Sequence, residues 1–221
     1  MRGEAKPLAK MMTGADTRFV IPVYQRNYDW KHEQCKRLFD DLEEVVREGR
    51  PSHFFGSIVS KASMERRVLI DGQQRVTTTF VLLAALCRQV QAGLIASDDP
   101  EKTARYIRSQ WLVDEFDEVE KLKLKLVKGD QEAFAKVIEG DPDKLVDGSN
   151  VTENYRYFLG RIASTELTAE ELRDAVKKTR GHRHKPGDRR QRATHLREPE
   201  LHGPRPVRGR QDTQLRPHGP A

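Results

Sequence analysis

A long apolar helix that directly follows a strand restricts the possible folds of this chain more than any other feature. Residues 66–70 have a strand-like pattern, and after Asp71 and Gly72 a helical segment occupies residues 73–90. Residues 76–86 are apolar on nearly every face, which is typical of a helix buried in the middle of a domain. Because the connection is so short, the first amides of the helix face whatever lies beyond the end of the strand.

The remaining periodicity predicts a mixture of strands and amphipathic helices. Strands are expected at 19–23, 53–60, 66–70 and 121–126, with 53–60 and 66–70 forming a hairpin. Helices are expected at 29–48, 101–111, 131–139, 151–162 and from Thr168 onward.

Several side chains have expected local roles. Asp29 and Asp130 are the expected N-caps of their helices, and Thr168 with Glu171 forms a capping box. The strict alternation at 121–126 places its three lysines on the solvated face of a strand: Lys121, Lys123 and Lys125.

The formal charge of +6 averages two unlike parts of the chain. Residues 177–221 contain 13 Lys and Arg against four acidic residues, whereas residues 1–176 contain 27 basic and 30 acidic residues. The 177–221 segment has no aromatic residue and cannot bury a core, so we expect a disordered basic tail there. The rest divides into a lead-in at 1–18, a core at 19–95 and an incomplete helical extension at 96–176.

The sequence argues against several classes of protein. No run of 18 apolar residues occurs, and no apolar stretch of a secretory signal follows the charged N-terminus, so we expect a cytoplasmic protein without a membrane span. Cys35 and Cys87 are isolated on apolar helical stripes, where we expect small core residues and no disulfide or nucleophile. His32 and His53 lack metal-ligand spacing.

Three short motifs hold the residues best suited to chemistry. They are residues 21–30 (IPVYQRNYDW), 54–59 (FFGSIV) and 70–78 (IDGQQRVTT). We expect the aromatic and aliphatic residues of 54–59 in the core, with Gly56 allowing a close backbone approach. Tyr24, Tyr28 and Trp30 are packing residues or an aromatic shelf on which a base could stack.

The 70–78 motif has the features of an anion site. Gly72 permits a positive φ or the close approach of a ligand, and the amides of Gln73 and Gln74 are helix-start donors suited to a phosphate. Arg75 adds a planar fork for phosphate oxygens, and Thr77 and Thr78 offer hydroxyl donors one turn later.

Each of these residues also has a simpler interpretation. Asp71 is either a plain N-cap or a ligand for a divalent cation. Gln73 could equally be a surface residue. Arg75 is unfavourable near a helix start unless an anion lies between, because the helix dipole repels a cation there. That conflict favours a phosphate site.

In order and spacing, the three motifs resemble the N-terminal domain of the GmrSD-type restriction endonucleases over residues 15–176. That domain is a branch of the ParB/sulfiredoxin-like fold. The resemblance implies an α+β fold, with a small sheet and a buried central helix, followed here by a partial helical extension and the disordered basic tail.

The resemblance also implies a ligand and a site. Proteins similar to this domain bind and hydrolyse nucleoside triphosphates in defence against phage or modified DNA, with Mg²⁺ as the expected ion. Carried over to this chain, Gln25, Arg26 and Asp71 would be catalytic, and Asp71 would also hold the metal. The nucleotide would be bound by the remaining motif residues, which are Tyr24, Gly72, Gln73, Gln74, Arg75 and Thr77.

In such enzymes DNA is cleaved by a C-terminal HNH-type nuclease domain, and we find no such domain after residue 176. DNA would therefore be reached through a missing or separate nuclease domain. Whether this chain alone is an enzyme stays open.

The change of composition at residue 177, inside a well-marked helix, suggests an out-of-frame translation of a GC-rich gene. The competing interpretation is a genuine basic arm, which would make the chain a non-enzymatic DNA-binding or interaction remnant.

Overall fold

The computed structural model describes residues 4–7, 11–12, 18–63, 66–117 and 119–184. Within these residues, a six-stranded sheet has the order β1-β6-β3-β4-β2-β5. The strands are Glu4–Pro7 (β1), Arg18–Val20 (β2), His53–Ser63 (β3), Arg66–Asp71 (β4), Leu124–Lys125 (β5) and Thr179–His184 (β6). The α-helices are His32–Arg47 (α2), Gln73–Gln91 (α3), Pro100–Ile107 (α4), Lys128–Glu139 (α5), Asn150–Ala163 (α6) and Ala169–Lys178 (α7). The predicted α+β class is confirmed.

The sheet brings the first and third motifs together. β3 and β4 form the predicted antiparallel hairpin, and β2 pairs with β4 in parallel. Because β2 ends at Val20 and β4 ends at Asp71, the chain leaves both parallel strands at the same edge of the sheet. The motif at 21–30 and the motif at 70–78 therefore begin side by side.

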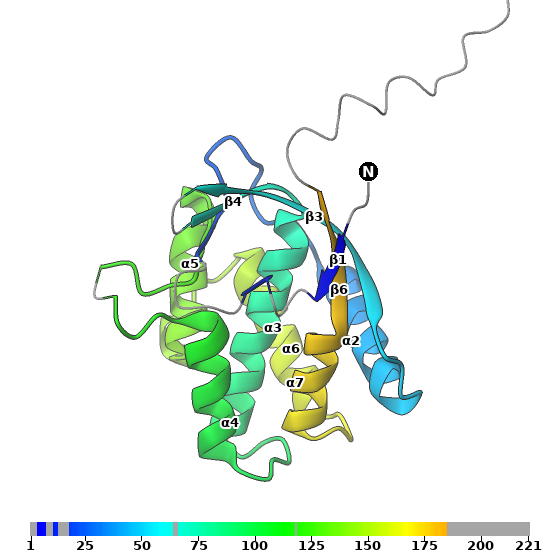
Figure 1. Cartoon of the computed structure of the whole chain (residues 1–221). Coiled ribbons are helices and arrows are strands. Elements are labelled where there is room, and N and C mark those ends of the chain that lie inside the picture. The colour runs from blue at the N-terminus through cyan, green and yellow to red at the C-terminus, as the bar shows by residue number, and fades with distance from the viewer. Residues whose placement is uncertain (1–3, 8–10, 13–17, 64–65, 118, 185–221) are drawn as a thin grey trace, which may run out of the picture. The chain divides into compact units, whose positions relative to one another are not determined.

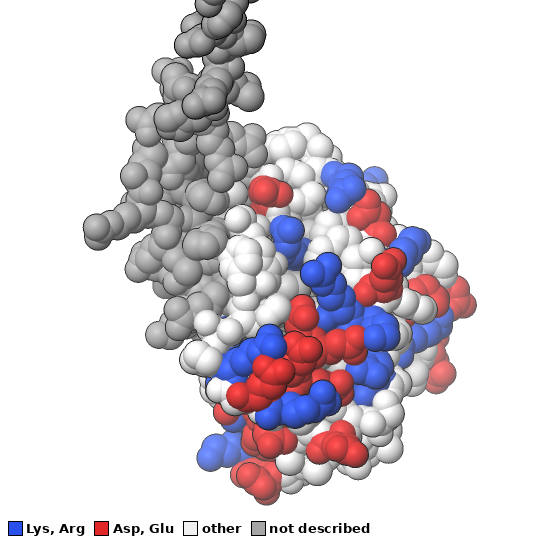
Figure 2. Space-filling view, turned by 90° about the vertical axis from the view of Figure 1, so that its right-hand side faces the viewer, with Lys and Arg blue, Asp and Glu red and all other residues white. Residues whose placement is uncertain are grey.

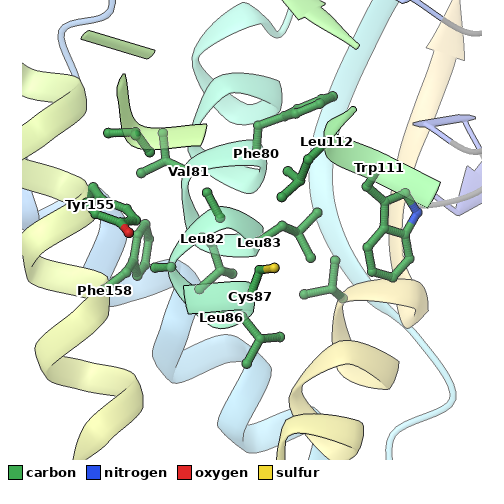
Figure 3. Close-up of a cluster of buried hydrophobic side chains, with 14 of the residues drawn as sticks. Phe80, Val81, Leu82, Leu83, Leu86, Cys87, Trp111, Leu112, Tyr155 and Phe158 are labelled. Carbon is green, nitrogen blue, oxygen red and sulfur yellow. The ribbon is translucent and has the colours of Figure 1, made fainter. Parts of the chain in front are cut away.

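Helix α3 is the centre of the core, as its apolar pattern predicts. It lies in the middle of the folded unit, beneath the β3–β4 hairpin, with the other helices around it (Figure 1). Phe80 contacts Phe19 and Phe134 in edge-to-face arrangements, with ring centroids 6.5 and 6.2 Å apart. Figure 3 shows the apolar side chains of α3 packed between those of neighbouring helices, and its labelled residues are Phe80, Val81, Leu82, Leu83, Leu86, Cys87, Trp111, Leu112, Tyr155 and Phe158.

Two expected caps and one expected surface lysine have other roles. The N-cap position of helix α2 is occupied by Lys31 and that of α5 by Val127, so neither Asp29 nor Asp130 is an N-cap. Lys123 is buried, and its Nζ donates to the carbonyls of Ser109 and Gln110 at 2.7 and 3.0 Å. Both carbonyls belong to a short π-helical turn at Arg108–Leu112, and strand periodicity cannot reveal such acceptors.

The folded part extends further than the composition indicates, at both ends. Helix α7 begins with the predicted Thr168–Glu171 capping box and continues to Lys178. Strand β6 follows it and lies between β1 and β3. Strand β6 thus lies in the first residues of the segment expected as a tail from 177, and β1 lies in the lead-in at 1–18. Residues 185–221 of the expected tail lie outside the described residues.

Both cysteines are free and buried, as expected. Among the described residues, no helix has the length and apolar character needed to cross a membrane.

Candidate functional site

The turn between β4 and α3 is built around Gly72. Its backbone has a φ of +89°, and an added Cβ would lie 3.0 Å from the carbonyl oxygen of Ser57. Only glycine fits this close crossing of β3 at a left-handed φ. The amide of Val76 bonds to the carbonyl of Gly72 at 3.1 Å, so the preceding amides of α3 have no acceptor within the helix.

Asp71 does not cap the helix. It is exposed, and its Oδ1 accepts the adjacent amide of Gly72 at 2.8 Å. No group of three or more His, Cys, Asp or Glu side chains that could hold a metal ion occurs in the described part of the chain. A magnesium ion would thus depend on the Asp71 carboxylate with phosphate and water oxygens, which is a set that this ion commonly takes.

The 21–30 motif contacts the helix start directly. Gln25 donates from Nε2 to the carbonyl of Ile70 at 3.1 Å, at the end of β4. Both ends of the Gln74 side-chain amide bond to this motif. Its Oε1 accepts the backbone amide of Asp29, and its Nε2 donates to the carbonyl of Asn27, both at 3.0 Å. The Gln74 side chain is therefore a structural link, and only its backbone amide could bind a ligand.

Arg26, Gln73 and Thr77 line one narrow crevice beside the helix start, which has no room for a molecule of the size of water. Arg26 is exposed and forms an ion pair with Asp29 at 2.8 Å. The same crevice is lined by Asp130, a buried carboxylate of α5 that accepts the amide of Tyr28 at 2.7 Å. Burial raises the pKa of Asp130 above its ordinary value. Its position before a helical stripe resembled that of a cap, and no sequence signal marked it as a site residue.

Arg75 lies on the other side of the helix start. It points over Gly56, where an added Cβ would lie 2.6 Å from its Nε, and it donates from Nη1 to the carbonyl of Ser57 at 3.3 Å. Its guanidinium borders a cavity of about 410 Å³ between α2 and β3, whose lining includes Trp30, Arg37, His53, Phe55, Gly56 and Arg75. Trp30 and Phe55 meet there edge to face, with ring centroids 6.3 Å apart.

Among the described residues, Arg75 and Arg108 are partly buried arginines that donate to a backbone carbonyl and have no acidic partner. Arg18 is paired with Asp114 and Asp117, and Arg161 is paired with Asp40 and Glu43. Among the described residues, no carboxylate lies within ion-pair distance of Arg75. A partly buried, unpaired guanidinium at the edge of a cavity is suited to an anionic ligand.

The structure thus divides the predicted site into two parts. Arg75 borders the aromatic cavity, whereas Arg26, Gln73 and Thr77 border the crevice, and the first turn of α3 lies between them. Tyr24 is 76% exposed and, like Asp71, lines neither part. Thr78 is buried and bonds within the protein, to Gln74 and Tyr28. The spacing of the motif could not show that Arg75 points away from its neighbours.

The sequence profile of the GmrSD restriction endonuclease, N-terminal domain, matches residues 8–183. The chain belongs to this family. The match covers both parts of the candidate site and all of α7, and it ends within β6. No curated protein matches the chain. The GmrSD N-terminal domain is associated with restriction of DNA. The match to the family continues to residue 183, beyond the change of composition at residue 177.

Proposed function

We propose that this GmrSD N-terminal domain binds a nucleoside triphosphate at the start of α3 and hydrolyses it, as a regulatory domain of a phage-defence restriction system. The observation that carries the proposal is Arg75. Its guanidinium is held over Gly56, without a carboxylate partner among the described residues, beside an aromatic cavity and the first amides of a buried helix, which have no acceptor within that helix. Charge and donors of this kind favour a polyphosphate.

Each part of the site has a proposed role. Arg75 and the first amides of α3 hold the phosphates, and Trp30 with Phe55 provides aromatic surface for the base. The cavity of about 410 Å³ lies in the usual range of small-molecule sites, roughly 300–1,000 Å³. A magnesium ion, when bound, would offset the phosphate charge beside Asp71.

Gln25 is the proposed water-orienting residue. Its Nε2 is fixed on the carbonyl of Ile70, so its Oε1 is free to accept a hydrogen bond from an attacking water. Arg26 is exposed and is able to exchange Asp29 for a phosphate oxygen, because surface ion pairs are weak.

Calorimetric titration of the full chain with magnesium nucleotides tests the proposal. Arg75→Ala should weaken binding by about tenfold to a hundredfold, the effect of losing charge-assisted hydrogen bonds. Arg88→Ala is the matched control, because Arg88 is an exposed arginine at the other end of the same helix and its loss should change nothing.

Equal affinity in the parent protein and Arg75→Ala would overturn the site. A separate measurement of phosphate release distinguishes binding from hydrolysis. For Gln25→Ala we expect a lower rate of nucleotide hydrolysis at an unchanged nucleotide affinity. A parent protein that binds DNA in a salt-dependent manner and no nucleotide would favour the DNA-binding alternative.

A further inference from the structure

The backbone of residues 27–30 is held by side chains from helices that are distant in sequence. The amide of Tyr28 donates to Asp130 in α5 at 2.7 Å, and the carbonyl of Tyr28 accepts from Asn150 in α6 at 3.0 Å. The carbonyl of Trp30 accepts from Asn154 in α6 at 2.7 Å. Together with Gln74, these residues satisfy the successive polar backbone groups of a loop that has no regular structure.

The side chain of Tyr28 is part of the same arrangement. Its hydroxyl lies 2.8 Å from Oγ1 of Thr78 and accepts from Nδ2 of Asn154 at 2.9 Å. Tyr28 and Asn154 are 4% and 1% exposed, so water cannot replace these bonds without opening the core. Helix α5 also approaches the Asn27 side chain closely, because a Cβ at Gly129 would lie 3.0 Å from its Nδ2.

We infer that Asp130, Asn150 and Asn154 are positioning residues for the nucleotide site, and that the α5–α6 extension therefore sets its geometry. The inference rests on the proposed function. The loop that these residues hold contributes Arg26 to the crevice and Trp30 to the aromatic cavity. A loop fixed on both sides of the α3 start presents the two parts of the site in one arrangement.

The buried carboxylate is the strongest indication of such a role. Asp130 is 8% exposed, and among the described residues it forms no ion pair. Burying its charge therefore costs desolvation free energy, which an apolar side chain at the same position would not cost. What it provides is an acceptor for the amide of Tyr28, which would otherwise be unpaired in a buried place.

The test compares Asp130→Ala with Asp130→Asn in the full chain. Asparagine retains an oxygen that can accept the amide of Tyr28, and alanine does not. We expect Asp130→Ala to bind magnesium nucleotide about tenfold more weakly, as when the binding-competent loop falls to a tenth of the population. Asp130→Asn should restore the affinity of the parent protein. Asn150→Ala, at the partly exposed start of α6, should weaken binding without opening the core.

A second measurement needs no nucleotide. Quenching of tryptophan fluorescence by acrylamide reports mainly Trp30, because Trp111 is fully buried. Quenching should increase in Asp130→Ala and return to the value of the parent protein in Asp130→Asn.

The outcomes separate this inference from the proposed function. If the parent protein binds nucleotide, Arg75→Ala does not, and folded Asp130→Ala matches the parent protein in affinity and quenching, the inference is wrong and the proposed function stands. If Asp130→Asn is as defective as Asp130→Ala, the hydrogen bond is not what matters, and the inference is also wrong. If the parent protein binds no nucleotide, the proposed function fails with the role inferred from it, and quenching still shows whether Asp130 holds the loop.

Discussion

Gly56 shows how the absence of one side chain makes room for a neighbouring one. It lies in β3 where the register against β6 shifts, between Phe54 and Ser57, and its φ of +96° suits glycine alone. The guanidinium of Arg75 occupies the space that a Cβ would need. The position of Arg75 is thus determined by its own helix and also by the neighbouring strand.

Gly56→Ala is therefore expected to damage both stability and binding. A left-handed φ costs alanine about 1–2 kcal/mol, and the clash with Arg75 adds to it. Gly93→Ala is the matched control, because Gly93 has a φ of +68° with nothing within 4 Å of an added Cβ. Denaturant unfolding should show a loss in both variants, and calorimetry should show weaker nucleotide binding in Gly56→Ala alone. Unchanged binding in Gly56→Ala would contradict the account of Arg75.

The two cysteines should be inert in the folded protein. Burial raises the pKa of the Cys35 thiol to about 12 and raises that of Cys87, so the reactive thiolate is scarce at neutral pH. We expect no reaction with an aromatic disulfide reagent at pH 8 until denaturant is added, when both thiols should react together. Prompt modification of either thiol in the native protein would show that the helix carrying it is not packed as described.

For single residues, the sequence predicts which residue type a turn or helix start needs, but it does not predict the direction in which a side chain points. Gly72 and the Thr168–Glu171 capping box could be predicted, because a tight turn and a helix start each require particular chemistry. Asp130 and Lys123 could not, because their partners are backbone groups brought close only by the fold.

Among the elements, the central helix and the hairpin were predictable, and the pairing of distant strands was not. The α3 pattern needs no partner to be recognised, since it is apolar on nearly all sides. Strand β6 lies in a basic, polar segment, and nothing in its own sequence indicates that it pairs with β1 and β3. A strand such as β6 is held in the sheet by backbone pairing, and amino-acid composition does not predict this pairing.

Two truncations test the contribution of β6. Deleting residues 179–221 removes the strand between β1 and β3, and deleting residues 189–221 leaves it in place. With cross-strand pairs contributing roughly 0.2–1 kcal/mol each, the first deletion should lower the unfolding free energy by about 2–4 kcal/mol. The second should leave it unchanged. Equal stability of the two truncated proteins in urea would show that β6 does not support the sheet.

Over the whole molecule, the net positive charge misrepresents the folded part. Residues 1–176 are slightly acidic, and on the side where α2 lies the charged residues of both signs are interleaved (Figure 2). Arg161 with Asp40, and Arg50 with Glu44, are ion pairs of this kind. The described residues of this face form no continuous basic surface (Figure 2), and the site that we propose for an anion depends on a single guanidinium, that of Arg75.

The position of a bound nucleotide decides whether Arg75 has its proposed role, and a crystal structure with magnesium and a non-hydrolysable nucleoside triphosphate would show that position directly. We predict phosphate oxygens within hydrogen-bond distance of the Arg75 guanidinium and the first amides of α3, with the base against Trp30. A nucleotide bound elsewhere, with Arg75 still bonded only to the carbonyl of Ser57, would contradict the central claim.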